Sequence, residues 1–554
     1  RRMTAAATTT AAEDLAFGLA QVVGLPALTA AAGAPLSAED IAAIIEEADR
    51  FAREKVAPGW QEADRHGAVY ENGVVRTPPH YPGLYRDWIE AGWQSLAAPA
   101  ELHGVAMGGQ GLPGALWSAV QELMLAADAS FALGPLLTAG AIDLLCHHAT
   151  PAQAAAWLPP MISARWSGAM CLTEPQAGSD LGALRCRAEP RGDGTYAVTG
   201  QKIFITWGEQ DCSENTLYLI LARLPDAPPG SRGISLFGAP KFLADGRRNG
   251  IRCGGIERKM GIHASPTCVM LFEEAEAELV GEPHRGLPAM FAMMNNARLA
   301  VGVQGVAHGA RALALAEAYA AERVQFGTPI ARMPDVARML AEMRATTLAG
   351  RLLALEASVA GDRARLLGDG AAEARLALLT PIVKAWCTER GVENASLGIQ
   401  VHGGIGFVED TGAAQVLRDA RIAPIYEGTN GIQAIDLVSR KLARDQGATM
   451  RALIAEARGL DVRLDAALDG FARATEAMLA AQARDADEAQ ASAAAYLDAA
   501  GWVFGGWMLA RARAADAARY GTLAEFYLRR LLPRAAARGA EVEEGGAVLA
   551  LLAG

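Results

Sequence analysis

The residues whose types and spacing could do chemistry fall in four separated parts of the chain. In order, they are Cys171-Leu-Thr-Glu-Pro-Gln-Ala-Gly-Ser-Asp180, Gly200-Gln-Lys-Ile-Phe-Ile-Thr206, Glu322-Arg-Val-Gln-Phe-Gly327, and the pair Gln400-Val-His-Gly-Gly404 and Ile425-Tyr-Glu-Gly-Thr-Asn430. Threonine hydroxyls can hydrogen-bond the edge of a ring, and glycines let the backbone approach a ligand. A carboxylate such as Glu427 can act as a general base when an apolar site raises its pKa. Each part alone is a weak signal.

Several other chemistries are excluded by the motifs that the sequence lacks. There is no GxxxxGK[ST] phosphate loop, and the glycines at 403, 404 and 406 do not have the spacing of a dinucleotide fingerprint. There is likewise no GxSxG elbow and no HExxH zinc helix. The seven cysteines form no CxxC pair, and Cys146-His147-His148 has no second cysteine at a zinc spacing. We therefore expect no metal site and no disulfide framework.

Composition and charge indicate a large globular protein of several domains. The chain has 554 residues, of which 51% are hydrophobic and 20% charged, and its net charge is −11. That length exceeds what one hydrophobic core usually supports, and the acidic balance gives no general attraction to nucleic acid or anionic lipid. The uncharged stretch 15–37 is broken by glycines and prolines, so it is a poor membrane span or signal peptide. We expect a cytoplasmic protein with no stable membrane insertion.

Patterning along the chain predicts an N-terminal extension followed by four domains. Ser37 before Glu39 and Asp40 predicts a helix start, and long apolar periodicities over Arg298–Arg323 and Pro334–Val359 predict long helices. Short β-rich runs fill the region between them. The predicted segments are an N-terminal extension (1–37), a helical domain (38–168), a β domain (169–285), a second helical domain (286–445) and an additional Ala-rich helical domain (446–554).

Taken together and in this order, the four motifs resemble the acyl-CoA dehydrogenase family. The resemblance covers residues from about 38 to 445. The extension at each end resembles the long members of the family, especially the branch that includes 3-methylmercaptopropionyl-CoA dehydrogenase. The implied fold class is an α+β multidomain protein, with an N-terminal helical domain, a central β domain, a C-terminal four-helix domain and an extra C-terminal helical domain. FAD is implied between these domains.

The resemblance implies roles for individual residues around the FAD. Thr173, Thr206 and Leu172 lie near the flavin ring, Phe204 packs against it, and Ser179 lies near the pyrophosphate and the pantetheine path. Arg323 and Phe326 reach the FAD of a neighbouring subunit, and the Gln400–Gly404 loop with its glycines receives that subunit's pyrophosphate and adenosine. A homodimer follows from these roles. The full set of implied cofactor residues is Met170, Leu172, Thr173, Ser179, Phe204, Thr206, Arg323, Phe326, Gln400, Gly403, Gly404, Thr429 and Gly431.

Glu427 is the predicted catalytic base. Most family members carry the carboxylate in this Ile-Tyr-Glu-Gly-Thr context, while a minority place it at the position aligned with Ala297, and alanine cannot act as a base. Tyr426 would supply an aromatic wall, and Gly428 would permit close approach of the substrate. The predicted substrate residues are Ser179, Asn295, Asn296, Arg298, Tyr426 and Gly428.

The implied reaction is α,β-dehydrogenation of an acyl-CoA to a trans-2-enoyl-CoA, as in fatty acid β-oxidation. Glu427 takes the α-hydrogen as a proton, the β-hydrogen leaves as hydride to FAD, and electron-transfer flavoprotein reoxidises the flavin. The acyl group is 3-methylmercaptopropionyl or a fatty acyl chain. An alternative interpretation is an acyl-CoA oxidase that uses oxygen. A DNA-binding flavoprotein of the same fold is another, but residues 446–554 hold 12 Arg, no Lys and 14 acidic residues, a net charge of −2 that argues against it.

Overall fold

The computed structural model describes residues 10–99 and 103–551, and the chain folds into two compact units. The helical unit comprises the described residues of Arg1–Arg50, Ser118–Ala126 and Arg298–Gly554. The mixed unit comprises the described residues of Phe51–Trp117 and Ala127–Ala297. Residues 1–9 of the predicted N-terminal extension and 552–554 of the predicted additional domain lie outside the described part.

The mixed unit combines short helices with one large sheet. Helix α7 (Ala129–His148) is apolar on all sides. It is capped by Asp128, whose side chain accepts hydrogen bonds from the N–H groups of Ser130 and Phe131. A helix that is apolar all round must be buried, and nearly all of α7 is. Its Thr138 hydroxyl accepts a hydrogen bond from Gly168 N, which attaches the helix to strand β3 (Trp166–Cys171). The helices and the hairpin that precede the sheet are α4 (Trp60–His66), β1 (Val69–Glu71), β2 (Val74–Arg76), α5 (Tyr81–Ala91), α7 (Ala129–His148) and α8 (Pro151–Ile162).

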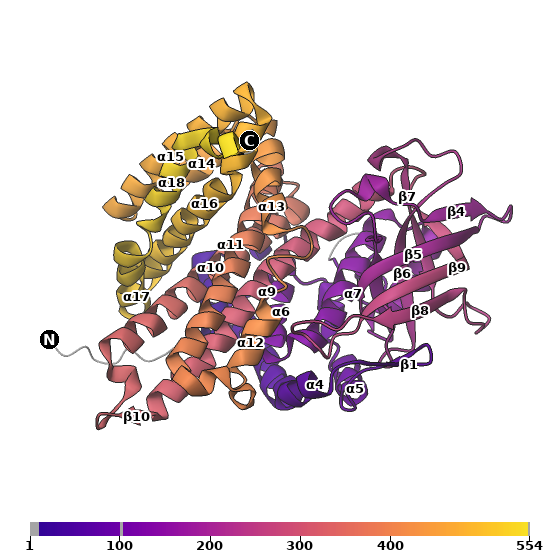
Figure 1. The fold of residues 1–554 in the computed structure, drawn as a ribbon, viewed down its shortest axis with the longest axis horizontal. Helices are drawn as coiled ribbons and strands as arrows, with labels where there is room; N and C mark the ends of the chain where they lie inside the picture. Colours follow the sequence, from indigo (N-terminus) through magenta and orange to yellow (C-terminus); the bar gives the residue numbers. More distant parts are fainter. Residues whose placement is uncertain (1–9, 100–102, 552–554) are drawn as a thin grey trace. The chain divides into compact units, whose positions relative to one another are not determined.

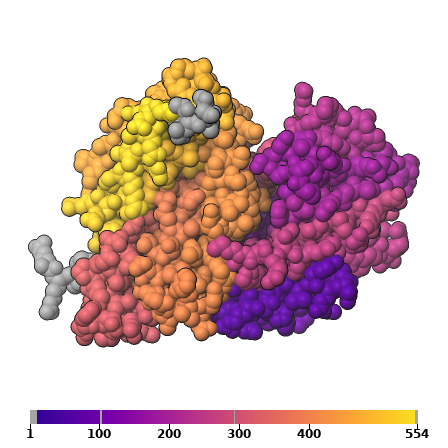
Figure 2. Space-filling view, viewed as in Figure 1, coloured from indigo at the N-terminus to yellow at the C-terminus, as the bar shows by residue number. Residues whose placement is uncertain are grey.

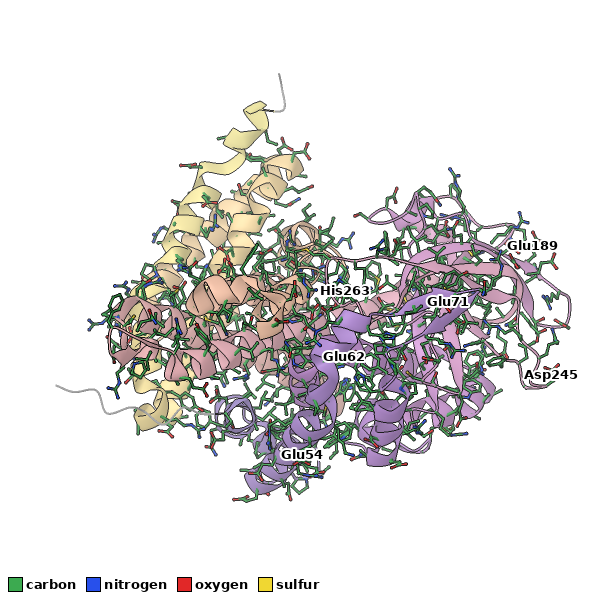
Figure 3. All side chains as sticks on the ribbon, turned by 60° about the horizontal axis from the view of Figure 1, so that its bottom comes forward. Glu54, Glu62, Glu71, Glu189, Asp245 and His263 are labelled. Carbon is green, nitrogen blue, oxygen red and sulfur yellow. The ribbon has the colours of Figure 1, made fainter. Side chains whose placement is uncertain are left out.

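The sheet has seven strands in the order β3-β6-β4-β5-β9-β7, with β8 paired to β9 and β6 also paired to β7 (Figure 1). Its inner side chains, among them Tyr218, Phe237 and Phe272, form a buried core. The acidic residues Glu189 and Asp245 are exposed and are labelled in Figure 3. The strands are β3 (Trp166–Cys171), β4 (Arg187–Pro190), β5 (Tyr196–Thr206), β6 (Asn215–Arg223), β7 (Ile234–Pro240), β8 (Ile251–Ile256) and β9 (Thr267–Val280).

The helical unit is built on long helices followed by a set of C-terminal helices. Helix α16 packs against α10 and α11 as well as against α15, α17 and α18, so the last hundred residues share a core with the preceding helices. Figure 2 shows these yellow and orange segments as one continuous surface. The helices are α9 (Gly286–Glu322, which begins in the mixed unit), α10 (Pro334–Leu367), α11 (Gly370–His402), α12 (Ala413–Ala420), α13 (Asn430–Asp436), α14 (Ala448–Glu456), α15 (Val462–Arg484), α16 (Ala486–Ala515), α17 (Ala517–Arg530) and α18 (Arg534–Glu544).

The N-terminal helices belong to the same unit and are attached to it by a buried ion cluster. Arg351 of α10 binds Asp14 at 3.2 Å and Glu122 at 2.5 Å, and Tyr520 of α17 donates to Asp14 at 2.8 Å. Burial raises the pKa of Glu122, while the Arg351 guanidinium opposes that rise. Four segments distant in sequence are thus joined at one point. The other N-terminal helices are α1 (Ala11–Phe17), α2 (Leu25–Ala31), α3 (Ala38–Phe51) and α6 (Gly114–Ala127), the last divided between the two units.

By length and apolar composition alone, α7 and α9 could each cross a membrane. For α7, 89% of the most apolar window is already buried inside the protein, as expected for a core helix.

The predicted helix start is confirmed, because α3 begins at Ala38 and the Ser37 hydroxyl accepts a hydrogen bond from Asp40 N at 3.1 Å. The predicted succession of helical, β and helical regions is confirmed as well.

Candidate active site

Glu427 lies in a tight turn between α12 and α13. Its φ is +56° and that of Gly428 is +85°, so two consecutive residues occupy the left-handed region. For a glutamate this conformation is strained and must be held by its surroundings. Thr429 then caps α13, its hydroxyl accepting a hydrogen bond from Ile432 N at 3.3 Å. Gly431 follows in the first turn of that helix and is exposed.

The residues around Glu427 shift the pKa of its carboxyl group. Burial raises the pKa of Glu427, whereas the positive charges of Arg298 and Lys384 act to lower it. This combination suits a general base, which needs a pKa brought up toward neutral pH while its ionised form stays populated.

Arg298 lies beneath the turn rather than on the surface. Its side chain is buried, and its Nε donates to the backbone carbonyl of Glu427 at 3.4 Å. Burial lowers its pKa, and the neighbouring carboxylates Asp436 and Glu427 oppose that shift. The predicted substrate role of Arg298 stays a prediction, and in the structure it acts on the backbone of the base turn. Ala297 is buried beside it and carries no ionisable group.

Tyr426 and Gly428 flank the base, as the sequence motif requires. The Tyr426 hydroxyl donates to Gln304 Oε1, and Gln304 Nε2 lies 3.3 Å from His308 Nε2. Burial lowers the pKa of His308 to about 4, so this histidine is neutral at physiological pH. At Gly428, the φ of +85° disfavours any residue with a side chain, and a Cβ there would also crowd Gln433 Nε2 at 2.7 Å.

In the mixed unit, the predicted flavin segment at Leu172 and Thr173 is held by β5. Lys202 Nζ donates to Leu172 O at 2.9 Å, and Ile203 N donates to Thr173 O at 2.9 Å. Lys202 is fully buried and also binds Glu174 Oε1 at 2.8 Å. These hydrogen bonds fix the backbone that carries the Thr173 hydroxyl.

Phe204 is displayed outward by an irregularity in β5. The pairing of β5 with β9 shifts register between Lys202 and Ile205, and Phe204 there has a φ of +59° and is 58% exposed. Bulges of this kind re-aim a side chain, often beside an active site. Thr206 ends the strand, and the next residue, Trp207, is buried with its Nε1 donating to Ser130 O at 3.1 Å. The exposed ring of Phe204 thus lies two residues from the Thr206 hydroxyl, and the buried Trp207 anchors this end of β5.

The remaining predicted residues of the mixed unit differ in accessibility. Met170 is buried in β3, which is buried along almost its whole length, so its side chain belongs to the core. Ser179, Asn295 and Asn296 are exposed, and Asn296 donates to Asp143 of α7. The predicted ligand roles of these three exposed residues and of the buried Met170 stay predictions.

The residues predicted to serve a neighbouring FAD gather at one end of the helical unit. Arg323, at the end of α9, is exposed, and Phe326 is 97% exposed with a φ of +49°. His402, at the end of α11, stacks on Tyr319 of α9 with ring centroids 4.6 Å apart, which brings the two helix ends together. Gln400, Gly403 and Gly404 are exposed, and a Cβ built at either glycine would meet open space.

These donor sets fit FAD. Thr173, Thr206 and the exposed ring of Phe204 match a flat heterocycle with polar edges. The exposed Arg323 and the open backbone at Gly403 and Gly404 match phosphates. Within the described residues, no group of three or more His, Cys, Asp or Glu could hold a metal ion.

Comparison with known proteins defines the class. The chain matches the acyl-CoA dehydrogenase N-terminal domain over residues 38–165, the middle domain over 169–275 and the C-terminal domain over 284–442, and a domain described as acetyl-CoA dehydrogenase C-terminal like over 446–552. The chain therefore belongs to the acyl-CoA dehydrogenase family, and it is an FAD-dependent oxidoreductase.

Individual relatives agree with this assignment. The chain is 46% identical over 505 residues to 3-methylmercaptopropionyl-CoA dehydrogenase of Ruegeria pomeroyi, covering 85% of this chain and 84% of that protein. It superposes on the acyl-CoA dehydrogenase of Bacillus anthracis complexed with FAD with a TM-score of 0.77 and 21% identity, over 92% and 88% of the two chains. A structure described as the electron transferring flavoprotein of Acidaminococcus fermentans matches with a TM-score of 0.63 and 28% identity, over 74% of this chain and 98% of that one.

Lys384 and Lys202 are the residues that the sequence argument missed. Each is a fully buried lysine that binds the backbone of a motif segment. A signal was present for Lys384, since it is the single charge in the apolar run Leu378-Leu-Thr-Pro-Ile-Val-Lys-Ala-Trp-Cys387. A lysine in such a run is almost never buried without a partner.

Proposed function

We propose that this protein dehydrogenates a short acyl-CoA of the 3-methylmercaptopropionyl type, with Glu427 as the base. The observation that carries the catalytic part is the left-handed turn that holds Glu427 between the charges of Arg298 and Lys384 while burial raises its pKa. The substrate class is supported by the 46% identity, which extends over 85% of this chain and 84% of that relative.

The chain's own residues divide the work as follows. Glu427 accepts the α-proton at a carboxylate oxygen, and its backbone N–H is the expected donor to the thioester carbonyl, where negative charge develops. Gly428 lets the backbone take the left-handed turn that carries Glu427. Phe204 and Thr206 orient the cofactor, and bound FAD supplies the acceptor for the β-hydride.

A substrate panel tests this proposal. Purified holoprotein is mixed anaerobically with 3-methylmercaptopropionyl-CoA, butyryl-CoA and palmitoyl-CoA, and loss of flavin absorbance is followed. We expect the first to reduce the flavin fastest at limiting concentration. Reduction by palmitoyl-CoA alone would contradict the substrate class, and no reduction by any of the three would contradict the activity.

The electron acceptor is proposed to be electron-transfer flavoprotein, with the reaction serving β-oxidation-type metabolism of the acyl group. The match to a structure described as an electron transferring flavoprotein supports this choice. Turnover with purified electron-transfer flavoprotein is compared with peroxide release in air. Peroxide formation at the rate of substrate consumption would instead identify an oxidase.

We further propose a cytoplasmic homodimer. The end of the helical unit that carries Arg323 and Gln400 also exposes several large apolar side chains, which a second copy would cover: Val324, Phe326, Ile405, Phe407 and Val408. Light scattering of the flavin-loaded protein should give twice the mass of one chain, and cell fractionation should place it in the soluble fraction. A flavin-loaded monomer, or recovery with the membranes, would contradict the respective part.

A further inference from the structure

Lys384 is the most deeply buried charge beside the base turn. It lies in the middle of α11, its side chain is 0% exposed, and its Nζ donates to Gly428 O at 2.8 Å and to Asn430 Oδ1 at 2.9 Å. These two acceptors are one and three residues beyond Glu427. The Lys384 ammonium therefore bonds the turn at two points just after the base.

Asn430 completes the attachment of the turn to α11. Its Nδ2 donates to Glu389 Oε1 at 2.8 Å and to Thr388 Oγ1 at 3.1 Å, and its backbone N–H donates to Pro424 O at 3.0 Å. The turn is thus bound to α11 through Gly428 and Asn430, and Asn430 N closes it onto its start at Pro424. A left-handed glutamate persists only where its surroundings determine it in this way.

The charges around Lys384 give it a second effect. The ionisable groups that face it are Glu427 of the turn, Arg298 of α9 and Glu389 of α11. Arg298 in turn faces Asp436 and Arg440 near the end of α13. Burial lowers the pKa of Lys384 to about 7, with Glu427 and Glu389 opposing the shift and Arg298 adding to it. Lys384 is therefore charged below neutral pH, where it stabilises ionised Glu427.

We propose that Lys384 is a positioning residue for the dehydrogenation: it holds the turn that carries Glu427 in its left-handed conformation, and its charge keeps the base ionised. This inference rests on the proposed role of Glu427. It adds a group that does not touch the substrate and acts through the base alone.

The test separates the hydrogen bonds from the charge. Lys384→Met removes both, Lys384→Gln keeps a donor without charge, and Asn430→Ala keeps the charge but removes one acceptor. Thr380→Val, on the same helix, is the control, because its hydroxyl bonds Leu376 O of its own helix. For each protein, the flavin reduction rate at saturating acyl-CoA and the acyl-CoA Kd are measured from pH 5 to 9.

Both Lys384 variants should raise the apparent pKa of the base by about 1 to 3 units, the size of the effect of one neighbouring opposite charge. Lys384→Met should also slow reduction at least about tenfold at neutral pH, since less base is then ionised. Asn430→Ala should slow reduction without moving that pKa, and Thr380→Val should match the wild type.

An unchanged apparent pKa in Lys384→Gln would overturn the electrostatic role, and wild-type rates in both Lys384 variants would overturn the inference as a whole. If neither Lys384 variant folds, the Asn430→Ala variant decides. Flavin reduction at the wild-type rate in that variant would overturn the inference as a whole. The wild type run in parallel tests the function separately. If it is not reduced by any acyl-CoA, the proposed function and this inference both fail.

Discussion

Replacing Lys202 with methionine tests how the predicted flavin segment is held. The Lys202 side chain is 0% exposed and that of Glu174 is 4% exposed, and their charged atoms lie 2.8 Å apart. Burial alone would raise the pKa of Glu174, but the Lys202 ammonium and the N–H groups of Arg185 and Cys186 hold it below its usual value. Lys202→Met therefore leaves a buried carboxylate without its counter-charge.

The expected cost follows from that burial. Removing one partner of a buried ion pair typically costs about 3 to 5 kcal/mol of unfolding free energy. For a unit of this size, each kcal/mol lowers the melting temperature by about 2 to 4 °C, so we expect a fall of roughly 6 to 20 °C. The FAD Kd should also rise, because Lys202 binds the Leu172 carbonyl.

The assay is thermal unfolding of the holoprotein at a fixed excess of FAD, with FAD affinity measured in parallel by titration. Lys202→Met with Glu174→Gln should recover most of the loss, since no unpaired charge then remains. Lys55→Met is the control, because Lys55 and Asp87 form an exposed pair at 3.1 Å in the same unit, worth about 0 to 1 kcal/mol. A single Lys202 variant no less stable than the Lys55 control would refute the reasoning.

Three further predictions concern other parts of the molecule. Burial raises the pKa of Asp128 to about 7 from 3.8, so its contribution to stability is complete below about pH 4 and lost as the pH rises through 7. Asp128→Asn should therefore flatten a plot of melting temperature against pH between about pH 4 and 7. An unaltered slope would contradict this prediction. Arg351→Met should destabilise the helical unit by about 3 to 5 kcal/mol, because Asp14 and Glu122 lose their shared buried cation; a change below about 1 kcal/mol in denaturant unfolding would exclude that role. Phe326→Ser should weaken the dimer and FAD retention together without lowering helix content, as measured by light scattering, flavin absorbance and circular dichroism, and a flavin-loaded dimer of wild-type affinity would count against the proposed interface.

The architecture was predictable from the sequence because local patterns specify it. Helical periodicity marks α9 and α10, and β-rich runs separated by turn residues mark the sheet. The roles of the motif residues were predicted from the resemblance of the four motifs, taken in order, to the acyl-CoA dehydrogenase family. The structure adds that Glu427 and Phe204 both lie at positive φ, which residue type alone does not reveal.

The supporting contacts could not be predicted because they join residues far apart in sequence. Lys384 meets Asn430 across 46 positions, and Arg351 meets Asp14 across 337. Which carbonyl a buried lysine reaches depends on how the helices pack, and composition does not fix that. Met170 shows the converse, since a residue inside a cofactor motif lies in a strand that is buried along almost its whole length.

The central claim is that Glu427 is the base, and Glu427→Gln with a stopped-flow measurement tests it most directly. Glutamine has nearly the same volume and can still hydrogen-bond, but it cannot accept the α-proton near neutral pH. The variant should keep its fold, FAD and acyl-CoA binding while flavin reduction slows by about 10² to 10⁴-fold, the usual contribution of a positioned base. Bleaching of the flavin within tenfold of the wild-type rate would show that another group takes the proton.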